Sequence, residues 1–197
     1  MGVSTELCCD DISVFVIQKE DVGMKIRGII INTVIIVLVL SVTVFASGKW
    51  QVSVSEDVMT GTKIWYATSP RVDSLGRMGF PYGGTKAWIG IGYDGESEWI
   101  YIGFTNAPNL VDTTTRNGYD LIETRIKWDD DLETASFTQS WGSQFIHFRD
   151  YAAAIKRIEE SNTVLIELDW YGEGKVHFEF PLTGSAAAIK EIRSAFK

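Results

Sequence analysis

Cysteine, proline and histidine are all scarce in this chain. Of its 197 residues only two are cysteine, Cys8 and Cys9, and both precede a long apolar stretch. The 151 residues after Ala46 therefore contain no thiol, which excludes a disulfide framework, a thiolate nucleophile and a cysteine-based metal site. No cysteine follows the apolar stretch directly, so a lipoprotein anchor is excluded as well. A chain of this length can bury enough apolar surface to fold without disulfides.

The two histidines give little support for catalysis. His177 alternates with apolar residues in "KVHFEF", which predicts a position on the exposed face of a strand. His147, in "FIHF", is expected to be a packed or half-exposed residue at the end of a strand. The patterns His-x-x-x-His, His-Glu-x-x-His and Gly-x-Ser-x-Gly are absent. We therefore predict a protein that is not an enzyme and that needs no cofactor.

An excess of positive charge is also lacking. After Ala46 there are 15 Lys and Arg residues against 21 Asp and Glu residues, with no basic run. Nucleic-acid binding depends on clustered positive charge, so no nucleic-acid partner is expected. The most acidic stretch, Asp129, Asp130 and Asp131, offers oxygen ligands for Ca²⁺ but lacks the EF-hand spacing and glycine. We interpret it as a solvated turn and keep its three carboxylates as candidates for a binding surface.

One long apolar stretch, residues 28–46, contains no charged residue. Read from Met24, the sequence has the order of a secretory signal: a basic start, an apolar core and a cleavage site with small residues. We predict cleavage between Ala46 and Ser47. The signal peptide then covers residues 24–46, and the mature protein is periplasmic or extracellular.

The alternative is an uncleaved transmembrane anchor, because the stretch is close to the roughly 20 apolar residues that span a bilayer. Lys25 and Arg27 would keep the N-terminal side in the cytoplasm and place residues 48–197 outside the inner membrane. Residues 1–23 are then a cytoplasmic tail, whereas a start at Met24 makes them a mis-assigned leader. Under both interpretations the same domain is exported, and any membrane contact is made by residues 28–46 alone.

The chain after Ala46 is dominated by a period of two, which is typical of strands. "WQVSVS" alternates apolar and polar residues, and "AWIGIGYDGESEWIYIGF" holds two β-rich runs joined by Asp94-Gly95, a pair that suits tight hairpin turns. "NTVLIELDWYGEGKVHFEFPL" predicts another hairpin that turns at Gly172. Helical spacing occurs only in residues 151–158 and in "TGSAAAIKEIRSAF".

These patterns predict a single exported domain, residues 47–197, of the mainly β (α+β) class. We expect about eight to nine antiparallel strands in a β-sandwich or a partly open barrel, with one middle helix and one C-terminal helix. Residues 70–85 and 105–118 are expected to be loops, because they are rich in turn-forming residues. The C-terminal helix is expected to bury Ile192 and Phe196.

Aromatic residues are plentiful, and all seven tryptophans follow Ala46. Six of them lie in strand-like runs, where burial in the core is expected: Trp50, Trp65, Trp88, Trp99, Trp128 and Trp170. Trp141 and the loop residues Phe80 and Tyr82 are the candidates for an exposed contact. Aromatic side chains suit both sugar stacking and protein interfaces.

Motifs at both ends of the exported part are similar to a known group of proteins. The motif residues are Trp50, Val52, Asp57, Met59 and Thr60 at the start, and Phe180, Gly184, Ala188 and Ile189 at the end. On these motifs the chain resembles the small exported bacterial β domains that include the VasI-like accessory proteins of type VI secretion. The resemblance implies export and the fold, and it implies no catalytic residue. The two cysteines of that group would fall at Gly92 and Lys197, and neither is cysteine here.

The sequence thus predicts an exported domain that acts by binding another cell-envelope protein and not by catalysis. The alternative is a periplasmic domain that binds, or acts on, carbohydrate or another small ligand through loop aromatics and acids. The oligomeric state is left open. The candidate surface residues are Phe80, Tyr82, Trp141, Asp129, Asp130 and Asp131.

Overall fold

The computed structural model of the protein describes residues 49–196. The predicted signal segment and its cleavage site at Ala46 and Ser47 lie outside the described residues. Residues 49–196 form one compact unit with its own hydrophobic core. Among residues 49–196, no helix combines the length and the apolar character that a membrane span requires.

Eleven antiparallel strands form one sheet in the described part of the chain. The strands are β1 (Gln51–Glu56), β2 (Lys63–Thr68), β3 (Val72–Asp73), β4 (Lys86–Tyr93), β5 (Glu98–Phe104), β6 (Thr113–Arg116), β7 (Tyr119–Trp128), β8 (Asp131–Ser140), β9 (Phe145–Phe148), β10 (Thr163–Trp170) and β11 (Gly174–Pro181). Their order across the sheet is β1-β2-β4-β5-β9-β8-β7-β10-β11, with β3 paired to β4 and β6 paired to β7.

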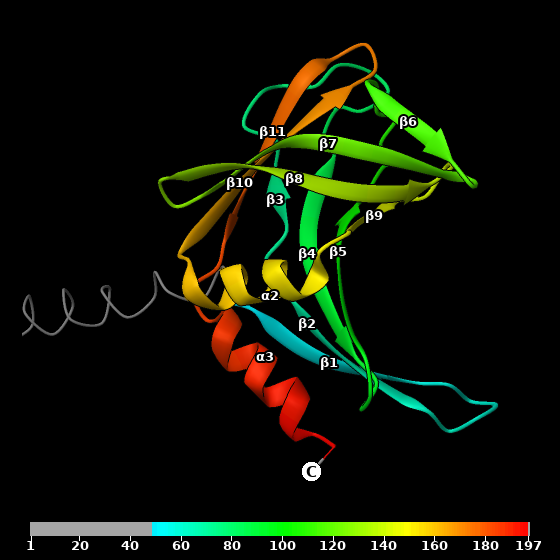
Figure 1. The fold of residues 1–197 in the computed structure, drawn as a ribbon, viewed down its shortest axis with the longest axis vertical. Coiled ribbons are helices and arrows are strands. Elements are labelled where there is room, and N and C mark those ends of the chain that lie inside the picture. Colours follow the sequence, from blue (N-terminus) through cyan, green and yellow to red (C-terminus); the bar gives the residue numbers. More distant parts are fainter. Residues whose placement is uncertain (1–48, 197) are drawn as a thin grey trace, which may run out of the picture. The chain divides into compact units, whose positions relative to one another are not determined.

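The sheet curls strongly, so that β7 and β8 cross in front of β4 and β5 (Figure 1). The segment that contains β3 links two distant parts of the curl. β3 pairs with β4, and the next residues reach β11, where Ser74 forms a bridge with Phe178. Leu75 N–H then donates to His177 O at 2.9 Å. This link draws β4 and β11 toward each other without closing the sheet.

The predicted fold class is confirmed: the domain is mainly antiparallel β, with one middle helix and one C-terminal helix. The two strands beyond the predicted nine are β3 and β6, which lie in residues 70–85 and 105–118. The prediction that these segments lack strands was wrong. β3 has two residues and β6 reads "TTTR", so neither carries the alternation of apolar residues that marks a half-buried strand.

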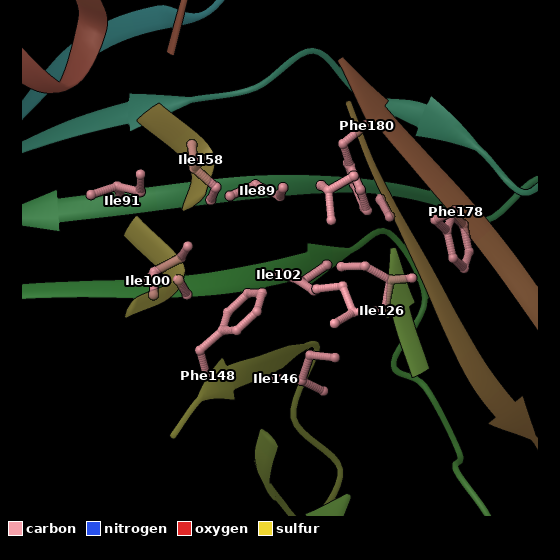
Figure 2. Close-up of a cluster of buried hydrophobic side chains, with 14 of the residues drawn as sticks. Ile89, Ile91, Ile100, Ile102, Ile126, Ile146, Phe148, Ile158, Phe178 and Phe180 are labelled. Atoms are coloured by element: carbon pink, nitrogen blue, oxygen red, sulfur yellow. The ribbon is translucent and has the colours of Figure 1, made fainter. Parts of the chain in front are cut away.

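The core is built from every second residue of the strands. Ile89 and Ile91 of β4 meet Ile100 and Ile102 of β5, and each is at most 1 % exposed. Figure 2 shows these side chains pointing toward residues from β9, β7, β11 and the middle helix. Burial of each such side chain stabilises the fold by about 1.5–3 kcal/mol before the entropy of ordering is subtracted.

The middle helix, α2 (Tyr151–Glu160), begins at Asp150, whose carboxylate accepts a hydrogen bond from Ala153 N at 3.0 Å. Such a cap stabilises the first turn by about 1 kcal/mol. One face of α2, including Ile155 and Ile158, is buried against the sheet. The helical periodicity of residues 151–158 therefore predicted the helix and most of its buried side, but Tyr151 of the same stripe is 51 % exposed.

The C-terminal helix, α3 (Ser185–Ser194), begins at Gly184 with no side-chain cap. Ser185 Oγ instead donates to Ile158 O of α2 at 2.7 Å, which ties the two helices together. Ile192 is fully buried, as predicted, but Phe196 is 40 % exposed. The prediction for Phe196 was wrong because its ring packs edge-on against Tyr93 at the rim of the sheet.

Candidate functional site

Four connections between strands meet at one end of the domain, which we name the loop end. It consists of residues 74–85, 105–112, 141–144 and 171–173, and its upper part surrounds the tip of the β10–β11 hairpin (Figure 1). Hydrogen bonds join neighbouring connections: Asn106 Nδ2 to Thr85 Oγ1 at 2.9 Å, Gln144 Nε2 to Thr105 O at 3.1 Å, and Tyr171 N to Asn109 O at 2.8 Å. The loop end is thus one hydrogen-bonded assembly of long and short connections.

Large apolar side chains project into solvent from the loop end. Phe80 is 100 % exposed and Trp141 is 91 % exposed. Leu75 and Tyr171 are each 63 % exposed on the same set of connections. The structure therefore places Phe80 and Trp141 at the surface, as the sequence led us to expect. Exposed aromatic side chains on ordered connections are a recurrent feature of binding surfaces.

Tyr82 lies differently from the prediction. Its ring packs edge-on against Trp170, with 5.4 Å between the ring centroids, and it adds to the core. The prediction of an exposed contact through Tyr82 was wrong, because residues 74–85 turn this ring inward while Phe80 turns outward. Tyr82 is only partly exposed, and its ring anchors the loop end to the core.

Further contacts hold residues 74–85 in place. Met78 is buried in the core, and Gly79 N–H donates to both carboxylate oxygens of Glu173 at 3.0 Å. Thr85 is buried and its hydroxyl donates to Tyr82 O at 2.6 Å. An open hollow of about 870 Å³ lies within this segment, with Phe80 on its lining. Phe80 is therefore presented by an anchored segment, which lowers the entropy cost of binding through it.

The three aspartates of the predicted binding surface lie at the turn between β7 and β8, away from the loop end. Asp129 accepts hydrogen bonds from Thr163 N at 2.9 Å and Asn162 N at 3.0 Å. These bonds hold the pKa of the Asp129 carboxyl below its usual range, and the bond from Thr163 has the largest effect. Asp130 and Asp131 have partners of their own in the salt bridges Lys127–Asp130 and Arg157–Asp131.

The acids therefore do not converge on one point. Among residues 49–196, no group of three or more His, Cys, Asp or Glu side chains is arranged to hold a metal ion. The interpretation of this stretch as a solvated turn agrees with its geometry, since Asp129 fastens the turn to the start of β10. The structure does not bring the aspartates and the aromatic candidates together.

A cluster of charged groups, which was not predicted from the sequence, lies on the outer face of the sheet and is centred on Glu167. Its side chain is only 6 % exposed. The carboxylate accepts hydrogen bonds from Arg125 Nε at 3.0 Å and also from Arg125 Nη2. Lys175 Nζ donates at 2.7 Å, and His177 Nε2 lies 3.0 Å away. The Arg125 bonds, followed by those from Lys175 and His177, lower the pKa of Glu167 to about 2 despite its burial.

Part of this cluster could have been found from the sequence. A hairpin that turns at Gly172 places Glu167 opposite His177, and this pairing is present in the structure. His177 lies on the face of β11 opposite Val176 and Phe178, as predicted, but its side chain is only 36 % exposed because it packs against Glu167. Arg125 could not have been found, because it comes from β7, which pairs with β10 across a long stretch of chain.

An aromatic strip covers the outer face of β4 and β5. Each ring lies over a glycine directly opposite: Trp99 over Gly92, Tyr101 over Gly90 and Trp88 over Gly103. A Cβ atom at any of these glycines would lie 2.2–2.4 Å from the facing ring. The prediction that Trp88 and Trp99 belong to the core was wrong. Aromatic rings that cover cross-strand glycines protect the backbone of such a strand pair.

His147 borders this strip on β9, as a strand-end residue that is partly covered by Tyr101. Partial burial lowers the pKa of His147 and raises that of Tyr101. Both groups are therefore neutral near pH 7. No carboxylate partner of His147 lies within salt-bridge distance among residues 49–196.

No family model, no curated protein and no solved structure matches this chain. The resemblance to the VasI-like accessory proteins therefore stays a prediction. The structure adds one fact about the cysteine position of that group. A side chain at Gly92 would meet the ring of Trp99 at 2.4 Å, so a cysteine could be accommodated only with a different arrangement of Trp99.

Proposed function

We propose that the domain is an exported, non-catalytic binding module whose loop end contacts another cell-envelope protein. The observation that carries the proposal is the exposure of Phe80 and Trp141 on connections that are anchored by hydrogen bonds and core contacts. Large exposed aromatic groups are enriched among the residues that dominate protein interfaces. Anchored connections need little further ordering on binding, so more of the contact energy becomes affinity.

The charged cluster at Glu167 supports a role other than catalysis. A carboxyl group with a pKa of about 2 is a very weak base near neutral pH, so Glu167 is poorly suited to accept a proton. Its carboxylate is hydrogen-bonded to Arg125, Lys175 and His177. The cluster thereby links β7, β10 and β11. We assign the cluster to the stability of the sheet. Export itself rests on the apolar stretch at residues 28–46.

The proposal predicts that truncation of the exposed aromatics abolishes partner capture. Purified Ser47–Lys197 is immobilised and exposed to detergent-solubilised envelope proteins of the source cell, and the most enriched protein is quantified. Phe80→Ser and Trp141→Ser are each expected to reduce its recovery at least about tenfold, as expected for central interface residues. Their unfolding free energies should stay within about 0.5 kcal/mol of the wild type, because the side chains touch little of the core.

Met59→Ser is the matched control, because Met59 is 92 % exposed on the β1–β2 connection, outside the loop end. This variant should capture the partner as well as the wild type does. Equal recovery by all four proteins would show that the loop end is not the contact surface. A loss with Met59→Ser as large as that with Phe80→Ser would contradict the proposal in the same way.

Carbohydrate binding is the second candidate, and the aromatic strip is the observation that favours it. Trp99 and Tyr101 lie over glycines on the outer face of the sheet, a position from which aromatic rings can stack on a sugar. Cell-wall glycan fragments titrated into Ser47–Lys197 distinguish the candidates by tryptophan fluorescence. Saturable binding that is lost in Trp99→Ala and kept in Trp141→Ala would establish this second function; the first proposal predicts no binding.

A further inference from the structure

The two end strands of the sheet differ in how their outer edges are covered. β11 is partly covered, because Ser74 bridges Phe178 and Leu75 N–H donates to His177 O at 2.9 Å. β1 pairs with β2 on one side, and within residues 49–196 no strand pairs with its other side. The outer edge of β1 therefore presents a row of backbone donors and acceptors to whatever lies beside it.

The features that usually prevent edge pairing are missing from β1. Its pairing with β2 runs through six consecutive residue pairs, from Gln51↔Thr68 to Glu56↔Lys63, so the strand has no bulge. The strand "QVSVSE" contains neither proline nor lysine, and its one charged residue is the last. Such an edge is a template for a further strand.

We propose that β1 pairs with β1 of a second copy of this chain, in antiparallel orientation, with the two Ser53 residues directly opposite each other. Core-facing residues must stay on one side of the joined sheet, and this condition limits the register to steps of two residues. With Ser53 at the centre, Val52 lies opposite Val54 of the second copy and Gln51 lies opposite its Ser55. Val52 and Val54 of the two copies then meet on the core side, and Gln51 and Ser55 meet on the outer side.

Charge selects this register over its neighbours. Lys49 lies opposite Asp57 of the second copy at each end of the interface, which gives two pairs of opposite charge. Moving the register one way places Lys49 opposite Ser55 and loses both pairs. Moving it the other way places Lys49 opposite Met59 and also loses both pairs.

A hollow adjoins the core-facing side of β1. It has a volume of about 450 Å³ and lies between the start of β1 and the start of α3, with Trp50 and Val52 on one side and Gly184 on the other. In the proposed register, Val54 of the second copy lies beside this hollow. Glu56 of the second copy lies opposite Trp50, close to the N-terminus of α3, which has no side-chain cap. A carboxylate near a helix N-terminus is favourable.

Single cysteines test the register directly, because Ser47–Lys197 contains no cysteine of its own. Residues directly opposite in an antiparallel pair have Cα atoms about 4.5–5.5 Å apart, which suits a disulfide bond. Under mild oxidation Ser53→Cys should form a disulfide-linked dimer. Gln51→Cys alone and Ser55→Cys alone should not, because their two copies would be about 14 Å apart along the strands. A mixture of these two variants should cross-link.

Lys49→Glu in the Ser53→Cys background is the test of charge, and it should lower the yield of the dimer several-fold. All these positions are exposed, so we expect the substitutions to leave folding unchanged. Circular dichroism of each sample checks this expectation. A Ser53→Cys protein that stays monomeric at concentrations up to about 1 mM would overturn the proposal. Equal cross-linking by all three single variants would overturn it too, since it would show that no register is preferred. Neither outcome bears on the loop end.

Discussion

Replacement of Trp170 by alanine is expected to lower the free energy of unfolding by about 3–5 kcal/mol, as for other large-to-small changes of buried tryptophan. Trp170 is fully buried at the end of β10. Its ring packs against Tyr82, Phe104 and Phe178 at centroid distances of 5.4, 5.6 and 6.2 Å. A loss of this size is a large part of the total stability of a typical domain, which is about 5–15 kcal/mol.

The change should also release the loop end. Trp170 forms a β-bridge with Leu110, and its ring packs against Tyr82. Residues 105–112 and 74–85 are therefore both held in place by Trp170. Urea unfolding gives the stability, and hydrogen exchange gives the protection of residues 74–85 and 105–112. We expect these two segments to lose protection first. Equal protection of both segments in the variant and in the wild type would contradict the anchoring role of Trp170.

Two control variants show whether the loss of stability comes from the packing of the buried ring. Trp141→Ala makes the same chemical change at a residue that is 91 % exposed, and it should cost less than about 0.5 kcal/mol. Trp170→Phe keeps an aromatic ring and removes the indole N–H, which is buried without a hydrogen-bond partner among residues 49–196. Because an unsatisfied buried donor is itself unfavourable, this variant should be much closer to the wild type than Trp170→Ala.

The second large effect is expected at Glu167. The hydrogen bonds from Arg125, Lys175 and His177 lower its pKa from 4.5 to about 2. At roughly 1.4 kcal/mol for each tenfold change in proton affinity, this is an upper bound of about 3 kcal/mol of stability near neutral pH. Arg125 and Lys175 are more than half exposed, and solvent screening reduces the value. We expect Glu167→Gln to destabilise the fold by about 1–3 kcal/mol at pH 7.

The sign of the pH dependence follows from the direction of the pKa shift. The folded state lowers the pKa of Glu167, so the ionised form stabilises the fold. Its contribution is complete above the unfolded value of 4.5 and disappears as the pH falls through about 2. The stability difference between the wild type and Glu167→Gln should therefore shrink between these pH values. Urea unfolding at several pH values measures this difference.

Glu179→Gln is the control for this series, because Glu179 is an exposed carboxyl group on the neighbouring strand. It should change stability by no more than a few tenths of a kcal/mol at any pH in the range. A difference for Glu167→Gln that stays constant from pH 7 to pH 2 would contradict the electrostatic account. It would mean that the variant acts through packing alone.

The hairpins of this fold could be predicted because their information is local. Asp94-Gly95 marked the β4–β5 turn, where Asp94 Oδ1 accepts from Ser97 N at 2.7 Å. Gly172 marked the β10–β11 turn, where it adopts a positive φ of 79° that glycine favours. Local periodicity also predicted α2 and α3. The order of strands across the sheet depends instead on contacts between distant segments, and no pattern in the sequence showed that β9 lies between β5 and β8.

The candidate site could be predicted only in part, for a related reason. Phe80 and Trp141 stood out because they lie outside any alternating run. Tyr82 lies in the same segment as Phe80, and only the contact with Trp170 distinguishes the two. The aromatic strip could have been recognised from "AWIGIGY", where Trp88 shares a face with two glycines and not with the isoleucines. Glu167 was missed because its partner Arg125 comes from a distant strand.

Photo-cross-linking in the living cell tests whether the loop end contacts an envelope protein. A photoreactive phenylalanine analogue is placed at residue 80, at residue 141 and, as the control, at residue 59. After illumination, we expect one common cross-linked protein from positions 80 and 141, and no such product from position 59. The same product from all three positions, or a product from position 59 alone, would contradict the proposed contact.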